Sequence, residues 1–373
     1  MKLLRIKAIA KKELIQIWRD PLSLAMAFMM PVMLLFLFGY AITLDVNNLK
    51  TVVYDLDHSV LSRELVDSFR ASGYFTVVGS IHEHKEIDSY LDSGKAFVAI
   101  SIPDKFSERV KTGNETAIQI IVDGSDSNTA TIALGYISAL TERFSQRHYK
   151  RIIGGRITPP IDTRVRVWYN PELKSRNFII PGLIAVIMGV ITALLTSLTI
   201  AREWERGTME QLISTPVKVS ELILGKLVPY FFIGFIDVLF SVLLAVFLFK
   251  VPLLGSPILL MLLSSIFLFG GLSLGILISI AAKSQLVASQ IALIATFLPA
   301  FLLSGLMFSI SNMPRPLQIF THIIPARYFV TILKGIFLKG STLKFLLFET
   351  MLLSIFGLFV FVAANKKFKK RIV

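Results

Sequence analysis

Residues 178–217 read FIIPGLIAVIMGVITALLTSLTIA followed by REWERGTMEQLISTPV, so a long apolar stretch passes directly into a short polar one. The apolar part, Phe178–Ala201, contains no charged residue. A bilayer core of about 30 Å needs about 20 apolar residues in a helix, so this part is predicted to cross a membrane. The fold is therefore that of a membrane protein, and the polar part is a connection between two spans.

The polar part, residues 202–217, predicts a short helix with defined ends. Gly207 supplies a turn, and Thr208 is expected to be the N-cap with Gln211 as its capping-box partner. Pro216 prevents the helix from continuing, which limits it to about two turns.

An apolar stripe runs along this short helix, because Met209, Leu212 and Ile213 are spaced at i, i+3 and i+4. A helix of this length cannot cover its own stripe, so we expect the stripe to be presented to another element. The alternative is an amphipathic connector that lies on the lipid surface.

Six stretches reach the length and apolarity of a membrane span. They are Leu22–Leu44, Phe178–Ala201, Leu227–Phe249, Pro257–Ala282, Ser284–Phe308 and Phe345–Ala364. The fourth and fifth are separated only by Lys283, which requires a tight hairpin. The first is too long for the apolar region of a signal peptide and is expected to remain as an anchor.

Composition supports a membrane protein, since 54% of the residues are hydrophobic and 17% are charged. Soluble domains have about 45–50% apolar and about 25% charged residues. The net charge of +14 lies entirely in the apolar part, because residues 45–176 contain equal numbers of basic and acidic residues. This distribution favours contact with membrane lipid and argues against nucleic acid. Without cysteine, the chain has no disulfides and no thiolate sites.

Basic residues concentrate in residues 1–20, in the loop 202–226 and in the tail 365–373. With six spans these segments lie on one side, which the positive-inside rule makes the cytoplasm of a bacterial inner membrane. Residues 2–18 have apolar residues at steps of three and four, Leu3, Ile6, Ala10, Leu14 and Ile17, and read as an amphipathic interfacial helix. A plain juxtamembrane anchor is the alternative.

Residues 45–177 would lie outside and are long enough for one domain. Predicted strands alternate there with predicted helices, which favours a compact α/β domain with a parallel or mixed sheet. The strands are Thr51–Asp57, Phe75–Gly79, Ala96–Ile102, Thr116–Val122 and Thr163–Trp168, and the helices are Leu61–Ala71, Lys85–Asp92, Asp104–Lys111 and Thr129–Arg151.

Catalytic motifs are not found in the sequence. A P-loop needs Ser or Thr after its Gly-Lys, whereas Lys95 and Lys226 are followed by Ala96 and Leu227, so the chain is not expected to bind or hydrolyse ATP. No metal or cofactor site is predicted. Asp237 falls inside a span, where a charged side chain is unfavourable because it is removed from water. It therefore either lines a path or carries a proton, or it hydrogen-bonds a neighbouring helix.

Several short motifs together resemble the membrane subunits of type-2 ABC exporters, and the resemblance covers essentially the whole chain. They are Lys11–Leu14, Arg19–Pro21, Glu205–Leu212, Ser304–Gly305, Met313–Pro314 and Ile324–Phe329. The resemblance implies a permease with six transmembrane helices, an extracytoplasmic α/β domain between the first two, and a separate ATPase that holds ATP and Mg. A second permease, identical or paralogous, would complete the path, and a periplasmic adaptor is a further candidate partner.

Under this resemblance, residues 202–217 are the coupling helix and its lead-in. The residues expected to couple to the ATPase are Glu203, Glu205, Arg206, Gly207, Thr208, Met209, Glu210, Gln211, Leu212 and Ile213. The stretch 309–343 would form short re-entrant helices at the outer end of the path, with Arg327 and Tyr328 in the gate and Asp237 as a path candidate.

Apolar residues on spans two and five, among them Ile179, Met188 and Phe301, predict a path for hydrophobic or amphiphilic cargo such as a drug-like compound or lipid. ATP-driven closure of the ATPase would push on residues 202–217 and on the first helix. Two other classes remain open: a membrane sensor that signals through a partner, and an ion-gradient transporter, which should show several midplane charges and inverted repeats.

Overall fold

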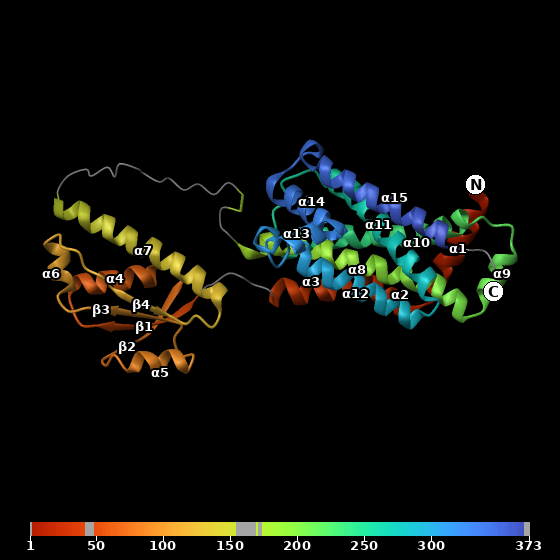
Figure 1. The fold of residues 1–373 in the computed structure, drawn as a ribbon. Coiled ribbons are helices and arrows are strands. Elements are labelled where there is room, and N and C mark those ends of the chain that lie inside the picture. Colours follow the sequence, from red (N-terminus) through yellow and green to blue (C-terminus); the bar gives the residue numbers. More distant parts are fainter. Residues whose placement is uncertain (1, 42–47, 154–168, 171–173, 369–373) are drawn as a thin grey trace. The chain divides into compact units, whose positions relative to one another are not determined.

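The computed structural model describes residues 2–41, 48–153, 169–170 and 174–368. Contacts divide the chain into two compact units, a helical unit formed by residues 1–43 and 167–373 and an α/β unit formed by residues 44–166. Figure 1 shows both units, coloured from red at the N-terminus to blue at the C-terminus. The predicted α/β domain, residues 45–177, overlaps the second unit, whereas Ser175 already begins a helix of the first.

The α/β unit contains one four-stranded sheet with the order β2-β1-β3-β4. Its strands are β1 (Leu49–Asp55), β2 (Phe75–Ile81), β3 (Val98–Ile102) and β4 (Gln119–Val122). β1 is parallel to β2 and β3, and β4 is antiparallel to β3, so the sheet is mixed. The predicted fifth strand, Thr163–Trp168, lies outside the described residues.

Helices cover both faces of this sheet (Figure 1). They are α4 (Val60–Ala71), α5 (Glu86–Asp92), α6 (Phe106–Lys111) and α7 (Ser127–Ile153). Successive residues of a strand point to opposite faces. Ile100 of β3 accordingly packs with Phe69 of α4 and Ile137 of α7, while its neighbour Ala99 packs with Ile87 of α5.

In the helical unit, five helices of the described residues are long and apolar enough to cross a membrane. They are α8 (Ser175–Glu205), α10 (Val219–Leu243) with its π-helical extension Leu244–Leu248, α11 (Pro257–Ala282), α12 (Gln285–Leu303), and α15 (Leu347–Lys367) with the 3₁₀ turn Leu343–Leu346. They correspond to the second to sixth predicted spans. The predicted hairpin is present, with Lys283 in the left-handed region at φ 55°.

The helices do not begin and end with the predicted spans. α10 begins at Val219, before the predicted span Leu227–Phe249, so Lys226 lies inside the helix. α12 ends at Leu303 rather than at Phe308, because Gly305 adopts a φ of +81° that a helix does not allow.

The first predicted span, Leu22–Leu44, is described only as far as Ala41. It follows α1 (Leu3–Trp18) and consists of α2 (Pro21–Leu24), a π-helical turn (Ala25–Met29) and α3 (Met30–Ala41). Pro31 has no N–H group and its ring excludes a normal contact with the preceding turn, so the hydrogen-bond ladder widens just before it. The apolar stretch Ala25–Tyr40 is shorter than the five spanning helices.

The region predicted to be re-entrant, residues 309–343, contains a broken pair of helices. A 3₁₀ turn at Ile310–Asn312 comes first, followed by α13 (Arg315–Phe320) and a second 3₁₀ turn at Thr321–Ile323. α14 (Pro325–Lys339) follows, and the chain bends by 85° between Arg315–Ile323 and α14. This geometry fits either a broken span or a re-entrant loop.

α8 is the central helix of the helical unit. In its most apolar window 83% of residues are buried, against 17% in α12 and 22% in α15. It contacts α3, α10, α11, α12 and α14. The outer helices therefore keep apolar surface for lipid or another chain, while α8 provides the surface on which they assemble.

Small residues allow α8 and α11 to approach closely. The Thr196 hydroxyl donates to the Leu272 carbonyl oxygen at 2.9 Å, and the Ser279 hydroxyl accepts from the backbone N–H groups of Ile200 and Ala201. Such contacts between small and hydroxyl-bearing residues hold helices together where lipid provides no hydrophobic driving force.

Gly275→Ala tests this contact. The new Cβ would lie 2.1 Å from Thr196 Oγ1 and 2.3 Å from the Ala193 carbonyl oxygen. Because the second atom is backbone, the helices must separate, and we expect a destabilisation of about 1–3 kcal/mol. The midpoint of thermal unfolding in detergent measures it. Gly189→Ala is the control, since its Cβ meets only the ring of Phe267 at 3.3 Å; equal midpoints for the two variants would contradict the prediction.

Candidate functional site

The short polar helix predicted within residues 202–217 is present as α9 (Thr208–Ser214). Gly207 reverses the chain with φ 68°, a conformation that favours glycine. The predicted capping box is wrong, because Gly207 occupies the N-cap position and Thr208 is the first helical residue. The Thr208 hydroxyl instead donates to the Glu203 carboxylate at the end of α8. The turn is thus closed by a side chain of the preceding helix.

The apolar stripe of α9 faces the chain's own core. Met209 is 0% exposed and belongs to the large hydrophobic cluster of the helical unit, against which Leu212 and Ile213 pack while half-buried. The expectation that Met209 is presented to another protein is therefore wrong. The element that covers the stripe is the helical unit itself.

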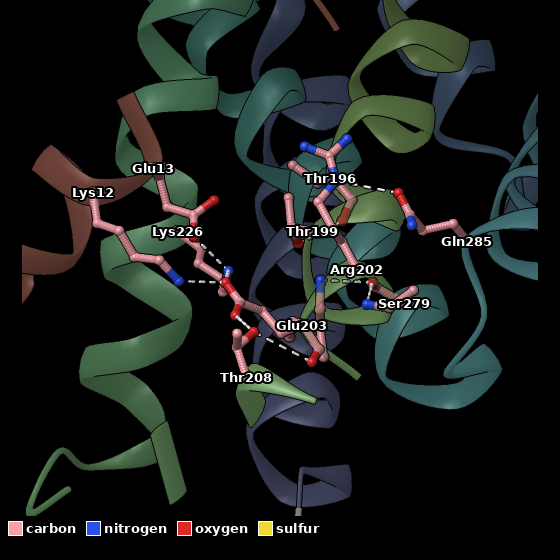
Figure 2. Close-up of polar contacts among 12 residues, drawn as sticks. Lys12, Glu13, Thr196, Thr199, Arg202, Glu203, Thr208, Lys226, Ser279 and Gln285 are labelled. Atoms are coloured by element: carbon pink, nitrogen blue, oxygen red, sulfur yellow. Dashed lines mark hydrogen bonds and ion pairs between the residues drawn. The ribbon is translucent and has the colours of Figure 1, made fainter. Parts of the chain in front are cut away.

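Glu203 is also buried, with 3% of its surface exposed, and it joins two lysines from different helices. Its Oε1 lies 2.5 Å from Lys12 Nζ of α1 and 3.3 Å from Lys226 Nζ of α10. Figure 2 shows these side chains converging where α1, α8 and α10 meet. A direct contact of Glu203 with a partner protein is excluded by this burial.

Lys226 is the centre of this cluster, because it also lies 2.5 Å from Glu13 of α1. Lys226 and Glu13 are 1% and 2% exposed. Removing charges from water is costly, and the cost is offset only when each charge has a close partner. Two carboxylates around one buried ammonium, with Lys12 beside Glu203, meet that requirement. We call Lys12, Glu13, Glu203 and Lys226 the ionic cluster.

A second set of contacts ties the start of α1 to the segment after α9. Glu221 accepts from the backbone N–H groups of Lys2 at 2.8 Å and Lys218 at 3.0 Å, and it pairs with Arg5 at 3.5 Å. Arg5 also donates to the Pro216 carbonyl oxygen. Both ends of the polar connection are therefore fixed to α1.

A third set fixes the end of α8 to its other neighbours. Arg202 pairs with Asp20 at 2.8 Å and donates to Gln285 Oε1 at 3.1 Å. Glu205 accepts from the backbone N–H of Gln285 at 2.7 Å and from its side-chain amide. Figure 2 shows Arg202 directed to Gln285, away from the ionic cluster. The end of α8 is thus bound to α1, α10 and α12 together.

Sequence reasoning missed the ionic cluster and the face of α1 that it uses. Of the predicted stripe Ile17 is buried, whereas Leu3 and Leu14 are 83% and 53% exposed. The other buried residues of α1 are Ile9 and Glu13. The sequence signal for this face was Glu13, because it lies four residues from both Ile9 and Ile17 and therefore on the same side of the helix. Its partner Lys226 lies 213 residues away in sequence, and no local pattern could have paired them.

Five of the ten predicted coupling residues are exposed: Glu205, Arg206, Gly207, Glu210 and Gln211. Because Glu205 is bound to Gln285, the charged and amide side chains left to face solvent are those of Arg206, Glu210 and Gln211. We call these three residues the exposed polar patch.

Asp237 lies on α10 and is 2% exposed. Within the described part of the chain its Oδ2 has no hydrogen-bond partner. Of the apolar residues expected to line the path on α8, Ile179 and Met188 are 2% and 0% exposed inside the helical core. The described residues contain no group of three potential metal ligands.

Arg327 and Tyr328 hold the bend before α14. Arg327 donates to the Thr321 hydroxyl, and the Tyr328 hydroxyl donates to the His322 carbonyl oxygen at 2.7 Å. Nearby, Lys334 Nζ donates to the Gly305 carbonyl oxygen at 3.0 Å and lies 3.3 Å from the centre of the Phe178 ring. This junction contacts the start of α8, whereas the ionic cluster contacts its end.

We predict that Lys226→Met destabilises the helical unit by about 3–5 kcal/mol, because it leaves Glu13 and Glu203 buried around an apolar side chain. Adding Glu13→Gln removes one of the two carboxylates and should restore part of the loss. The readout is the thermal unfolding midpoint in detergent, with Lys7→Met on the exposed side of α1 as control. If Lys226→Met is as stable as Lys7→Met, the cluster does not hold α1.

Comparison with known proteins identifies the family. The sequence model of the family described as "ABC-2 family transporter protein" matches residues 21–365 of this chain. Over 90% of this chain and 89% of the relative, the sequence is 41% identical to the probable multidrug ABC transporter permease YbhS of Escherichia coli strain K12. It is 32% identical to YbhR of the same strain, which bears the same description, over 91% of each chain. The chain therefore belongs to the ABC-2 transporter family and is a type-2 ABC permease.

Proposed function

We propose that this chain is the permease subunit of an ATP-driven exporter and that residues 202–217 couple it to a separate ATPase subunit. The observation that carries the proposal is the division of α9 into two sides. Its apolar side is fixed in the helical core through Met209, while Glu210 and Gln211 face solvent together with Arg206, the C-cap residue of α8. This arrangement supports a rigid contact element that a partner recognises through polar groups.

The ionic cluster connects α9 to the other helices of the helical unit, so that a movement of α9 is transmitted to them. A displacement of α9 reaches α8 through Thr208 and Glu203, and it reaches α1 and α10 through Lys12, Glu13 and Lys226. ATP and Mg are bound by the partner, whose closure shifts the equilibrium between inward-facing and outward-facing states. It can do so only by binding the two states with different affinity.

The remaining partners follow from the family. A second permease, identical or paralogous, completes the path, and exposed apolar residues on α12 and α15 such as Ile294, Leu298 and Phe359 offer surface for it or for lipid. The protein is a multi-pass membrane protein. We assign it to the bacterial inner membrane with both termini cytoplasmic and with the α/β unit outside, where a periplasmic adaptor is a candidate partner.

The cargo is proposed to be hydrophobic or amphiphilic, such as a drug-like compound or lipid. Relatives described as multidrug permeases support this class. Asp237 is proposed to line the path, because a buried carboxylate oxygen without a partner in the described residues is costly unless function requires it. Arg327 and Tyr328 are proposed to set the outer gate by fixing the bend before α14.

The coupling proposal is tested by reversing charges on the exposed polar patch with Arg206→Glu/Glu210→Arg. Complex formation with the cognate ATPase should fall at least tenfold, because both side chains would present the wrong charge to the partner. Thermal stability should stay unchanged, since both residues are exposed. Co-purification and stimulation of ATP turnover are the measurements.

Arg315→Glu serves as the matched control, because Arg315 is exposed on α13, next to the bend before α14. It should retain ATPase binding. Wild-type binding by the double variant would remove the exposed polar patch from the interface. Met209→Asp is not a suitable probe, because a buried charge would unfold the surroundings of α9.

A second prediction concerns Asp237. Asp237→Leu should be at least as stable as wild type, because it removes a buried carboxylate oxygen, Oδ2, that has no hydrogen-bond partner among the described residues. Export of a fluorescent amphiphile from vesicles should nevertheless be several-fold lower in Asp237→Leu than in wild type. In Asp237→Asn the decrease in export should be smaller. A marked loss of stability in Asp237→Leu, or unchanged export, would rule out the path role.

A further inference from the structure

The α/β unit contains a cavity of 870 Å³ between α6, the segment 113–118 and the middle of α7. Its base is apolar and is formed by Leu65, Phe106, Ile118 and Phe144. Sites for small molecules have volumes of roughly 300–1,000 Å³ and are lined mainly by apolar and aromatic side chains with a few polar groups. The cavity has this size and an apolar base, and more of its lining residues are polar than apolar.

The wall also contains a buried polar atom that is unpaired among the described residues. The Oγ1 atom of Thr116 is buried and has no hydrogen-bond partner among the described residues. His148, which also lines the cavity, is paired: Nδ1 lies 3.0 Å from the Phe144 carbonyl oxygen and Nε2 lies 3.0 Å from Glu64. An unpaired buried hydroxyl costs about 1–3 kcal/mol, and a ligand could supply its partner.

The remaining polar lining does not select for net charge. Ser138 and Thr141 of α7 bring hydroxyl groups to the wall. The charged residues Arg109, Glu115 and Glu142 are exposed and of both signs, so water screens them and they favour neither an anion nor a cation. A ligand with one full charge would gain little from this lining.

We propose that this cavity binds a small uncharged amphiphile, with its apolar body against Phe106 and Phe144 and a hydrogen-bonding group directed to Thr116. The size of the cavity, its apolar base and the unpaired hydroxyl support this occupant. The site lies in the α/β unit and shares no residue with the ionic cluster or with α9. It can therefore be tested whether or not residues 202–217 couple to an ATPase.

The test is hydrogen–deuterium exchange of the full chain in lipid nanodiscs, with N-phenylnaphthylamine as the uncharged probe. The method locates binding along the chain, so probe dissolved in lipid does not obscure the result. At a probe concentration ten times its dissociation constant, exchange in peptides covering residues 106–118 and 138–148 should slow by up to about tenfold. Anilinonaphthalene sulfonate, which has the same rings and one negative charge, should protect these peptides clearly less.

Ser138→Phe fills the cavity and should abolish the protection. Ala139→Phe is the matched control, because Ala139 is the adjacent exposed residue of α7 and does not line the cavity. The proposal is overturned if the uncharged probe protects neither peptide or if protection persists in Ser138→Phe. Equal or stronger protection by the sulfonate would overturn the assignment to an uncharged ligand, and protection lost equally in Ala139→Phe would show a general effect on α7.

Discussion

The position of one ammonium group, that of Lys226, determines how the end of the helical unit is built. Its partners Glu13 and Glu203 come from α1 and α8, and all three side chains are almost completely buried. In water such pairs contribute little, but a buried charge that loses its partner is strongly destabilising. Any other arrangement of the three helices would leave a buried charge without its partner and would be less stable. The ionic cluster therefore holds them in one arrangement.

Close packing extends this arrangement along α8. Because Gly271 and Gly275 leave room for Thr192 and Thr196, α8 and α11 meet at backbone distance. Gly225 does the same for α1, whose Ile9 would lie 2.7 Å from an added Cβ. Charges and small residues act together here: the glycines set how near the helices come, and the ionic cluster fixes their positions along one another.

The parts of this fold that depend on local pattern could be predicted from the sequence. The apolar spans, the alternation of strands and helices in the α/β unit, and the existence of α9 all follow from periodicity and turn residues. The first span, Leu22–Leu44, was predicted as one continuous stretch, whereas the structure has a π-helical turn just before Pro31. Contacts over long sequence separation could not be predicted, which is why Glu203 was expected at a protein interface although Lys12 and Lys226 bury it.

The error about Met209 has a physical lesson. A helix of seven residues is not stable alone, because the cost of starting a helix exceeds what so few hydrogen bonds return. If its apolar stripe were free until a partner arrived, α9 would have to fold during binding, and the cost of ordering would weaken the complex. With Met209 buried in its own chain, α9 is formed beforehand. Under the coupling that we propose, a partner would meet a fixed polar surface, and a force applied there would reach α8 instead of being absorbed by a flexible loop.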